Sequence, residues 1–183
     1  MELILFVLVS GGLALLSRHS LARPRSHGFY RFLAWELLLV LVLLNWRYWF
    51  VQPFAPRQLA SWVLLCGSIP LALAGARLLA RRGATHGGAR GEEPELFRFE
   101  RTTSLVTDGI YRYIRHPLYA SLLALVWGTA LKRPAAAALL LGLGATILLT
   151  VTAKLDEAEC RRYFGEDYVR YMAHSRMFVP FLF

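Results

Sequence analysis

Long apolar stretches make up most of the chain, and charged residues gather between them. Five such stretches cover residues 3–16, 32–51, 59–79, 118–131 and 135–153. A helix that crosses a bilayer needs about 20 mostly apolar residues, and in a single segment only a helix satisfies every backbone polar group without water. The pattern predicts an all-α integral membrane protein with about five transmembrane helices. The first and fourth stretches are short for a full crossing and need flanking residues to complete it.

Composition supports this fold class. Apolar residues make up 56% of the 183 residues and charged residues 18%, whereas soluble domains run at roughly 45 to 50% apolar and about 25% charged. Five helices leave little length for anything else, so we expect a single membrane domain over residues 1–183. Residues 3–16 lack the basic region that begins a signal peptide, which favours a span there.

The basic residues are distributed unevenly over the connections. If the N-terminus lies outside, all but four of the 21 Lys and Arg residues fall in cytoplasmic connections, and only Arg47, Arg57, Lys132 and Arg133 lie outside. This agrees with the positive-inside rule and predicts a cytoplasmic C-terminus. Connections that face anionic lipid explain the net charge of +9, so we expect membrane lipids as partners and no nucleic acid.

The two Cys and five His residues occur singly, without the short spacings of metal sites or disulfide frameworks. We therefore predict no metal site. The connection between residues 81 and 101 is rich in glycine and lacks apolar periodicity, which predicts a mobile loop over residues 83–93. The oligomeric state stays open, because the glycines in the spans could pack helices within one chain or between chains.

Polar chemistry gathers at the edge of the fourth apolar stretch, in YRYIRHPLYAS at residues 111–121. Proline is favoured at the first position of a helix, which makes His116 the expected N-cap of a helix that begins at Pro117. A helix N-terminus binds anions, and Arg112 and Arg115 add positive charge beside it. The alternative is that these basic residues only anchor the chain at the membrane surface.

A second polar cluster, at residues 153–180, follows the fifth stretch. Asp156 and Glu157 lie just past the expected membrane boundary, where surface pairing with nearby Lys and Arg residues is the alternative to a role in a site. Gly165 is suited to end one helix, and the acidic residues after it suit the first turn of the next helix.

The chain resembles the isoprenylcysteine carboxyl methyltransferase superfamily, which includes phospholipid N-methyltransferases. Two motifs carry the resemblance, LVTDGIYRYIRHPLYAS and DEAECRRYFGEDYVRYMAHSRMFVP. The resemblance covers roughly residues 105–180. The matching positions are Arg115, His116, Pro117 and Tyr119 for an RHPxY element, Asp156 and Glu157 for an acidic pair, and Phe164, Gly165, Tyr168 and Tyr171 for an FGxxYxxY element. The prenylcysteine enzymes have a histidine where this chain has Ser104, which weakens the case for a prenylcysteine substrate.

The resemblance implies S-adenosylmethionine-dependent methyl transfer to a lipophilic acceptor, which is a prenylcysteine-like carboxylate, a phospholipid amine or another small lipophile. It implies cofactor-binding elements at residues 105–121 and 153–180. The expected catalytic residues are Arg115, Glu157 and Tyr119, and the expected cofactor-binding residues are His116, Arg115, Tyr111, Pro117, Tyr119, Glu157 and Tyr168. Arg115 and His116 suit the carboxylate of the cofactor, and Glu157 suits its ribose hydroxyls or its ammonium. An amine acceptor would also need a base, for which Glu157, Asp156 and Tyr119 are candidates.

Three other functions stay open on the sequence alone. An NADPH-dependent membrane reductase could share the C-terminal architecture, although such chains usually have more spans. A transporter would carry ionisable residues inside its spans, whereas Glu36 and Arg47 each lie near the end of a span. A scaffold without catalysis would leave both motifs unexplained. Among membranes, we expect the bacterial inner membrane rather than the endoplasmic reticulum.

Overall fold

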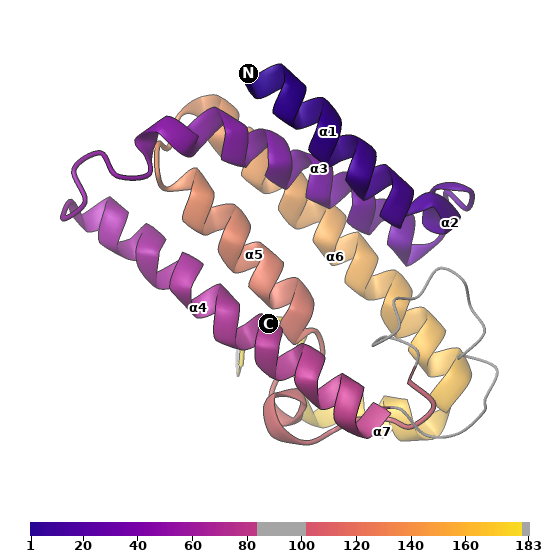
Figure 1. Ribbon diagram of the computed structural model, residues 1–183. Helices are drawn as coiled ribbons and strands as arrows, with labels where there is room; N and C mark the ends of the chain where they lie inside the picture. The colour runs from indigo at the N-terminus through magenta and orange to yellow at the C-terminus, as the bar shows by residue number, and fades with distance from the viewer. Residues whose placement is uncertain (84–101, 181–183) are drawn as a thin grey trace.

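A computed structural model describes residues 1–83 and 102–180, and these residues form helices and short connections with no β-strand. The all-α membrane fold predicted from the sequence is confirmed. The helices in chain order are α1 (Glu2–Leu16), α2 (Arg18–Leu21), α3 (His27–Asn45), α4 (Pro56–Leu78), α5 (Pro117–Ala130), α6 (Ala136–Phe164) and α7 (Glu166–His174) (Figure 1). The single-turn segments are Trp46–Tyr48 after α3, Leu79–Gly83 after α4 and Gly109–Arg112 before α5.

Among the described residues, three helical segments are long and apolar enough to cross a membrane, namely His27–Tyr48, Pro56–Gly83 and Ala136–Phe164. The other two apolar helices, α1 and α5, have 15 and 14 residues. The five predicted stretches therefore correspond to five apolar helices, and the first and fourth are short, as their apolar lengths predict.

Two helix boundaries differ from the apolar stretches. α3 begins at His27, before the predicted start at residue 32, because the side chain of Ser26 accepts a hydrogen bond from the backbone N–H of Phe29 and caps the helix. α6 continues past residue 153 to Phe164 and ends at Gly165, whose φ of 59° favours glycine. Polar residues continue both helices, so apolarity locates the membrane and not the helix ends.

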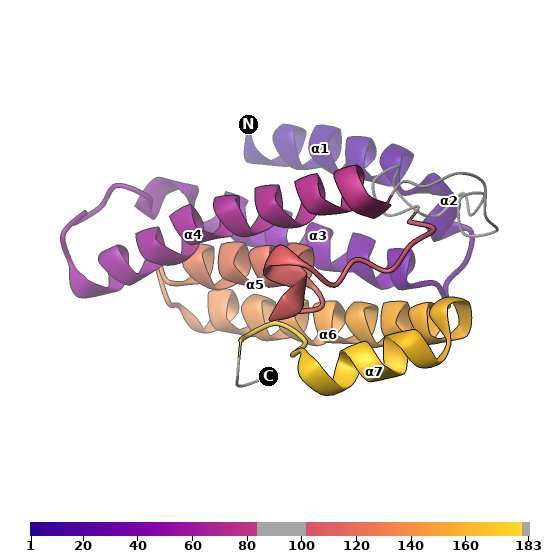
Figure 2. The same cartoon turned by 90° about the horizontal axis from the view of Figure 1, so that it is seen from below.

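The long helices pack in pairs. α4 lies against α5 and α3 lies against α6, while α5 also contacts α6 between the two pairs (Figures 1 and 2). The core between them contains Leu41, Val126, Ala138 and Ala145 near one end and Ala34, Leu149 and Ala153 near the other. α1 packs mainly on α3 and has no buried residue, so most of its apolar surface faces outward.

Two glycines allow the α4–α5 pair to approach closely. A Cβ atom on Gly128 of α5 would lie 2.8 Å from a side-chain carbon of Leu65, and one on Gly75 of α4 would lie 3.0 Å from the ring of Pro117. The second contact places the end of α4 against the first turn of α5. It therefore helps to position the segment that carries RHPLY.

At the opposite end of the bundle, Lys132 is fully buried, although its place in a short polar connection predicts exposure. Its Nζ lies 3.5 Å from the ring centre of Trp62 and 3.0 Å from Oε1 of Gln58. The Arg57 side chain donates to the Lys132 carbonyl over 2.7 Å. This cluster joins the start of α4 to the α5–α6 connection.

Two further predictions concern Glu36 and the connection after α4. Glu36 was expected near the end of a span, but because α3 begins at His27 it lies in the middle of that helix, with one carboxylate oxygen buried and unbonded among residues 1–83 and 102–180. The mobile loop predicted over residues 83–93 lies, apart from Gly83, outside the described residues.

Candidate active site

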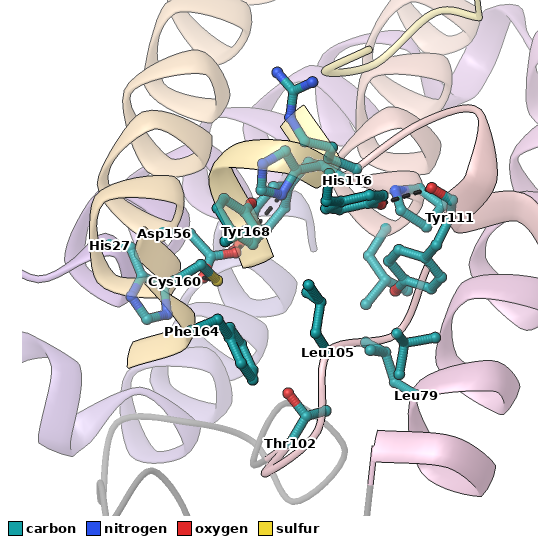
Figure 3. Close-up of a pocket in the computed structure, with 16 residues that line it drawn as sticks. His27, Leu79, Thr102, Leu105, Tyr111, His116, Asp156, Cys160, Phe164 and Tyr168 are labelled. Atoms are coloured by element: carbon teal, nitrogen blue, oxygen red, sulfur yellow. Dashed lines mark hydrogen bonds and ion pairs between the residues drawn. The ribbon is translucent and has the colours of Figure 1, made fainter. Parts of the chain in front are cut away.

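Four helix ends meet at the end of the bundle away from Lys132. They are the start of α3, the end of α4, the start of α5 and the end of α6 (Figure 1). A pocket with about 670 Å³ of space between its lining atoms lies among them and is partly open. Figure 3 shows side chains from α3, α5, α6 and α7, from Leu79 just after α4 and from the segment before α5 around this pocket.

The start of α5 has the predicted geometry. His116 is the N-cap residue and Pro117 the first helical residue, and both line the pocket. The His116 ring stacks on Tyr119 with 5.4 Å between ring centres and lies 6.2 Å from the ring of Phe178. Because the first amides of a helix have no partner within the helix, this end offers hydrogen-bond donors at the pocket.

Arg115 joins the two polar motifs. Its Nε donates to Oε1 of Glu157 over 2.7 Å, and the side chains of this pair are only 10% and 6% exposed. Its Nη1 also donates to the carbonyl oxygens of Met172 and Ser175. A buried ion pair is stabilising only when further hydrogen bonds satisfy its charges, and these carbonyls satisfy part of the guanidinium.

The C-terminal segment completes this arrangement. The backbone N–H of Arg115 donates to the Arg176 carbonyl over 2.7 Å, the N–H of Arg176 donates to the Tyr113 carbonyl over 2.9 Å, and the N–H of His116 donates to the Met177 carbonyl over 3.1 Å. The segment that carries RHPLY is thus paired along its backbone with the segment after α7. The two predicted cofactor-binding elements form one structural unit.

The acidic pair divides between two positions. Asp156 lines the pocket, whereas Glu157 is buried behind it against Arg115 and is not among the lining residues. His116 lies between them, with Nδ1 3.6 Å from Oδ2 of Asp156 and Nε2 3.4 Å from Oε1 of Glu157. Among the described residues, Nε2 of His116 has no hydrogen bond although it is buried. A polar group from a ligand could satisfy it.

Aromatic side chains of α7 and the end of α6 form another part of the wall. Phe164 stacks on Tyr168 with 6.4 Å between ring centres, and Tyr171 meets Tyr168 edge to face at 5.7 Å. Burial raises the pKa of the Tyr168 and Tyr171 hydroxyls above the ordinary value for tyrosine. Both phenols are therefore neutral near pH 7, and the wall they form is suited to an aromatic or apolar group.

The structure places the predicted site residues as follows. Six of the seven predicted cofactor-binding residues line the pocket, namely Tyr111, Arg115, His116, Pro117, Tyr119 and Tyr168. The seventh, Glu157, contacts Arg115 and His116 from behind. The motif residues Asp156, Phe164 and Tyr171 also line it.

Sequence reasoning missed other parts of the wall. Thr102 lies just before the predicted element of residues 105–121. It reaches the pocket because its segment runs back past the end of α4, where the N–H of Thr103 donates to the Gly83 carbonyl over 2.9 Å. His27, at the start of α3, lies far from either motif in the chain. Only the packing of α3 on α6 brings it to the pocket, so no local signal could have identified it.

His27 stands beside two carboxylates of α6. A ring nitrogen of His27 and one carboxylate oxygen from each of Asp156 and Glu159 lie within 4.8 Å of one another. Such a group could hold a metal ion. The prediction of no metal site rested on spacing along the chain, and it stays a prediction.

The family model for phospholipid methyltransferases matches residues 59–167. This range is more than half of the chain and includes α4, α5 and α6 with Arg115, His116 and Glu157. The chain belongs to the phospholipid methyltransferase family. The resemblance seen in the two motifs is confirmed.

One curated relative is similar to part of the chain. Over 76 residues the chain is 32% identical to the methanethiol S-methyltransferase of Crocosphaera subtropica. The matched region is 42% of this chain and 29% of the relative, so the chain spans less than a third of the relative's length. No solved structure matches the chain.

Proposed function

We propose that this protein transfers a methyl group from S-adenosylmethionine to a lipophilic acceptor at the cytoplasmic face of the membrane. The observation that carries the proposal is the buried Arg115–Glu157 pair, which joins the two motifs beside one pocket. A surface anchor would leave these charges exposed to water and lipid headgroups. Here they are almost completely buried and contact the pocket-lining His116.

The pocket fits the chemical groups of S-adenosylmethionine. Arg115, His116 and the first amides of α5 suit the carboxylate. Asp156 suits the ammonium or the ribose hydroxyls better than the expected Glu157, because Asp156 lines the pocket and Glu157 binds Arg115. Phe164 and Tyr168 suit the adenine ring.

These residues have distinct roles in the proposal. When bound, S-adenosylmethionine supplies an activated methyl group on a sulfonium. Arg115, His116 and Asp156 hold and orient it, and Glu157 fixes Arg115 and His116. Tyr119 keeps the His116 ring in place by stacking. Much of the rate then comes from holding the acceptor in line with the methyl group in a site from which water is excluded.

A second hollow supports a lipophilic acceptor. About 960 Å³ of space lies between α4, α5 and the C-terminal segment, lined by apolar side chains that include Leu71, Leu123, Trp127 and Phe178. Phe178 also faces the ring of His116. An acceptor with an apolar tail could therefore place the tail here and its reactive group near His116. The candidate reactive groups are a carboxylate, an amine or, from the name of the curated relative, a thiol.

The same proposal covers orientation and compartment. α1, α4 and α6 all run toward the end of the bundle that holds the pocket, while Arg57, Lys132 and Arg133 lie at the other end. With the positive-inside rule, this supports a cytoplasmic pocket and an outer N-terminus. We propose the bacterial inner membrane as its location. A reporter fused after α7 that is active only outside the cell would contradict this orientation.

Calorimetry on the detergent-solubilised protein tests the proposed function. We expect S-adenosylhomocysteine, the demethylated product, to bind and NADPH not to bind. A screen of lipid extracts and small thiols with labelled S-adenosylmethionine should then yield a methylated product that mass spectrometry identifies. Binding of NADPH without S-adenosylhomocysteine would instead indicate a reductase, and binding of neither would contradict enzymatic methyl transfer.

A further inference from the structure

We propose that the acceptor is a group that loses a proton when it is methylated, a thiol or an amine, and that His27 takes this proton with the support of Glu159. This inference rests on the proposed function and narrows its acceptor class. It concerns a residue outside the stretch that matches the family model. Neither motif accounts for its presence in the pocket.

His27 is a buried residue in the wall of the pocket. It is the first residue of α3, its side chain is 2% exposed, and it lines the pocket beside Asp156 and Cys160 (Figure 3). Its Nδ1 lies 2.9 Å from Oε2 of Glu159. The oxygen lies off the direction of the ring N–H, so the contact is electrostatic rather than a well-formed hydrogen bond. Among the described residues, none donates to or accepts from Nε2 of His27, which leaves this nitrogen for a ligand.

Burial opposes a positive charge on the His27 ring, whereas the carboxylates around it stabilise the charge once a proton is gained. Asp156 and Glu159 face it from α6, and together with the imidazole they form a cluster within 4.8 Å. The positive group on its own helix is Arg31, one turn later, whose guanidinium lies 5.3 Å from the ring centre of Trp35. Two carboxylates at this distance stabilise the imidazolium that forms when His27 accepts a proton.

The same charges select among acceptors. A carboxylate acceptor is already an anion and needs no base, and Asp156 and Glu159 would repel it. A thiol arrives neutral and an amine arrives neutral or as an ammonium, so neither is repelled. Both must lose a proton for the methylated product to form. A buried histidine between two carboxylates is thus useful to a thiol or an amine and of no use to a carboxylate.

The other candidate bases are less suitable. Asp156 is assigned to the ammonium or the ribose hydroxyls of the cofactor, and the Tyr119 ring is stacked on His116. Glu157 is held by Arg115 and does not line the pocket. The Tyr168 and Tyr171 phenols stay protonated because burial raises the pKa of each. His116 lies against Tyr119 and Phe178 between Asp156 and Glu157, where it is placed to bind the cofactor. His27 is the remaining imidazole of the pocket wall among the residues that the structure describes.

The transfer step balances as follows. A lone pair on the acceptor sulfur or nitrogen forms a bond to the methyl carbon of the sulfonium donor. The bond between that carbon and the donor sulfur breaks, and its electron pair stays on the sulfur. The acceptor proton passes to Nε2 of His27, before attack for an ammonium or during attack for a thiol. The imidazolium beside Glu159 then releases the proton to water when the product leaves.

The test uses the full chain in detergent with four variants. His27→Ala and Glu159→Gln remove the proposed base and its support. His19→Ala and Glu166→Gln are the matched controls, because both residues are exposed and neither lines the pocket. The affinity for S-adenosylhomocysteine is measured first for every variant. Methyl transfer is then followed with methanethiol, phosphatidylethanolamine vesicles and a farnesylated cysteine that has a free carboxylate.

We expect methylation of the thiol or the amine and not of the farnesylated cysteine. His27→Ala should lower kcat by about 10² to 10⁴, the range for loss of a general base, while its S-adenosylhomocysteine affinity stays within a few-fold of the parent. Added imidazole should restore part of the rate, which a structural role would not allow. Diethyl pyrocarbonate should modify His27, and the methylated acceptor should protect it.

The outcomes separate the two proposals. Loss of S-adenosylhomocysteine binding in the parent protein would overturn the proposed function itself. If the parent binds it, three results would overturn the inference about His27. They are methylation of the carboxylate probe alone, an unchanged kcat in His27→Ala, and failure to methylate any thiol or amine. Failure of diethyl pyrocarbonate to modify His27 would also contradict the inference.

Discussion

The hydroxyl of Tyr171 donates a hydrogen bond to the carbonyl of Tyr111 over 2.6 Å, so α7 holds the turn that precedes RHPLY. The two residues are 60 positions apart, and α5 and α6 lie between them in the chain. A helix that follows the bundle thereby fixes the backbone of a segment that precedes α5. Because Tyr111 and Tyr171 both line the pocket, this bond sets the spacing of two of its walls.

Removing this hydrogen bond should loosen the pocket. In Tyr171→Phe the ring stays and the donor is lost, so the Tyr111 carbonyl is left without it. We expect a cost of about 0.5 to 1.5 kcal/mol, seen as a two- to tenfold weaker affinity for S-adenosylhomocysteine in calorimetry. Tyr30→Phe is the control, because its ring packs on Phe29 away from the pocket. Equal affinities for Tyr171→Phe and the control would show that the bond does not shape the pocket.

The Arg115–Glu157 pair should behave as one unit. Arg115→Ala leaves the carboxylate of Glu157 buried without its guanidinium, which should cost about 1.5 to 3 kcal/mol of S-adenosylhomocysteine binding, or about tenfold to a hundredfold in Kd. Glu157→Gln should weaken binding less, and the double variant should lose less than the sum of both. Arg112→Ala, on an exposed residue of the same segment, is the control. Strictly additive losses would contradict the coupling.

Stability should fall at high pH through the tyrosines of α7. Burial raises the pKa of Tyr168 and Tyr171 in the folded protein, whereas an unfolded tyrosine titrates near about 10. Above that pH the unfolded state binds fewer protons than the folded state, so the free energy of unfolding decreases as pH rises. We expect thermal unfolding temperatures to fall between about pH 10 and 11.5, and less steeply in Tyr168→Phe. A decline of the same slope in that variant would contradict this assignment.

Lys132 should stabilise the end of the bundle away from the pocket without affecting the pocket. Its ammonium is buried against Trp62 and Gln58, and a desolvated cation–π contact of this kind is worth about 2 kcal/mol or more. Lys132→Ala should therefore lower the unfolding temperature while the S-adenosylhomocysteine affinity stays unchanged. Arg133→Ala removes a neighbouring, exposed cation and should change neither property much. Weakened cofactor binding in Lys132→Ala would show that the two ends of the bundle are coupled.

The membrane helices could be predicted because their signal is local. About 20 apolar residues in sequence identify a span whatever surrounds it, and each of the five stretches became a helix. The ends could not be predicted in this way. Ser26 caps α3 well before its apolar residues begin, and the polar residues from 154 to 164 continue α6, because no helix-breaking residue occurs before Gly165.

The pocket could be predicted in part. Proline is favoured at the first position of a helix, so the sequence identified His116, the residue before Pro117, as the N-cap of α5. Which of Asp156 and Glu157 faces the pocket depends on the rotation of α6 against α5, and the structure places Asp156 there. The part played by His27 depends on how α3 packs against α6, which no pattern along the chain records. The burial of Lys132 likewise depends on two tryptophans from other segments.

The Arg115–Glu157 pair has a consequence for the biogenesis of the protein. Its two residues flank the α5–α6 hairpin, so they meet only if both helices have entered the bilayer and returned to the same side. A chain in which α5 stays at the surface, or in which only one of the two helices inserts, would leave the charges on opposite sides of the membrane. A correctly formed pocket therefore shows that the α5–α6 hairpin has inserted correctly. The short length of α5 makes that insertion depend on its docking against α4 and α6.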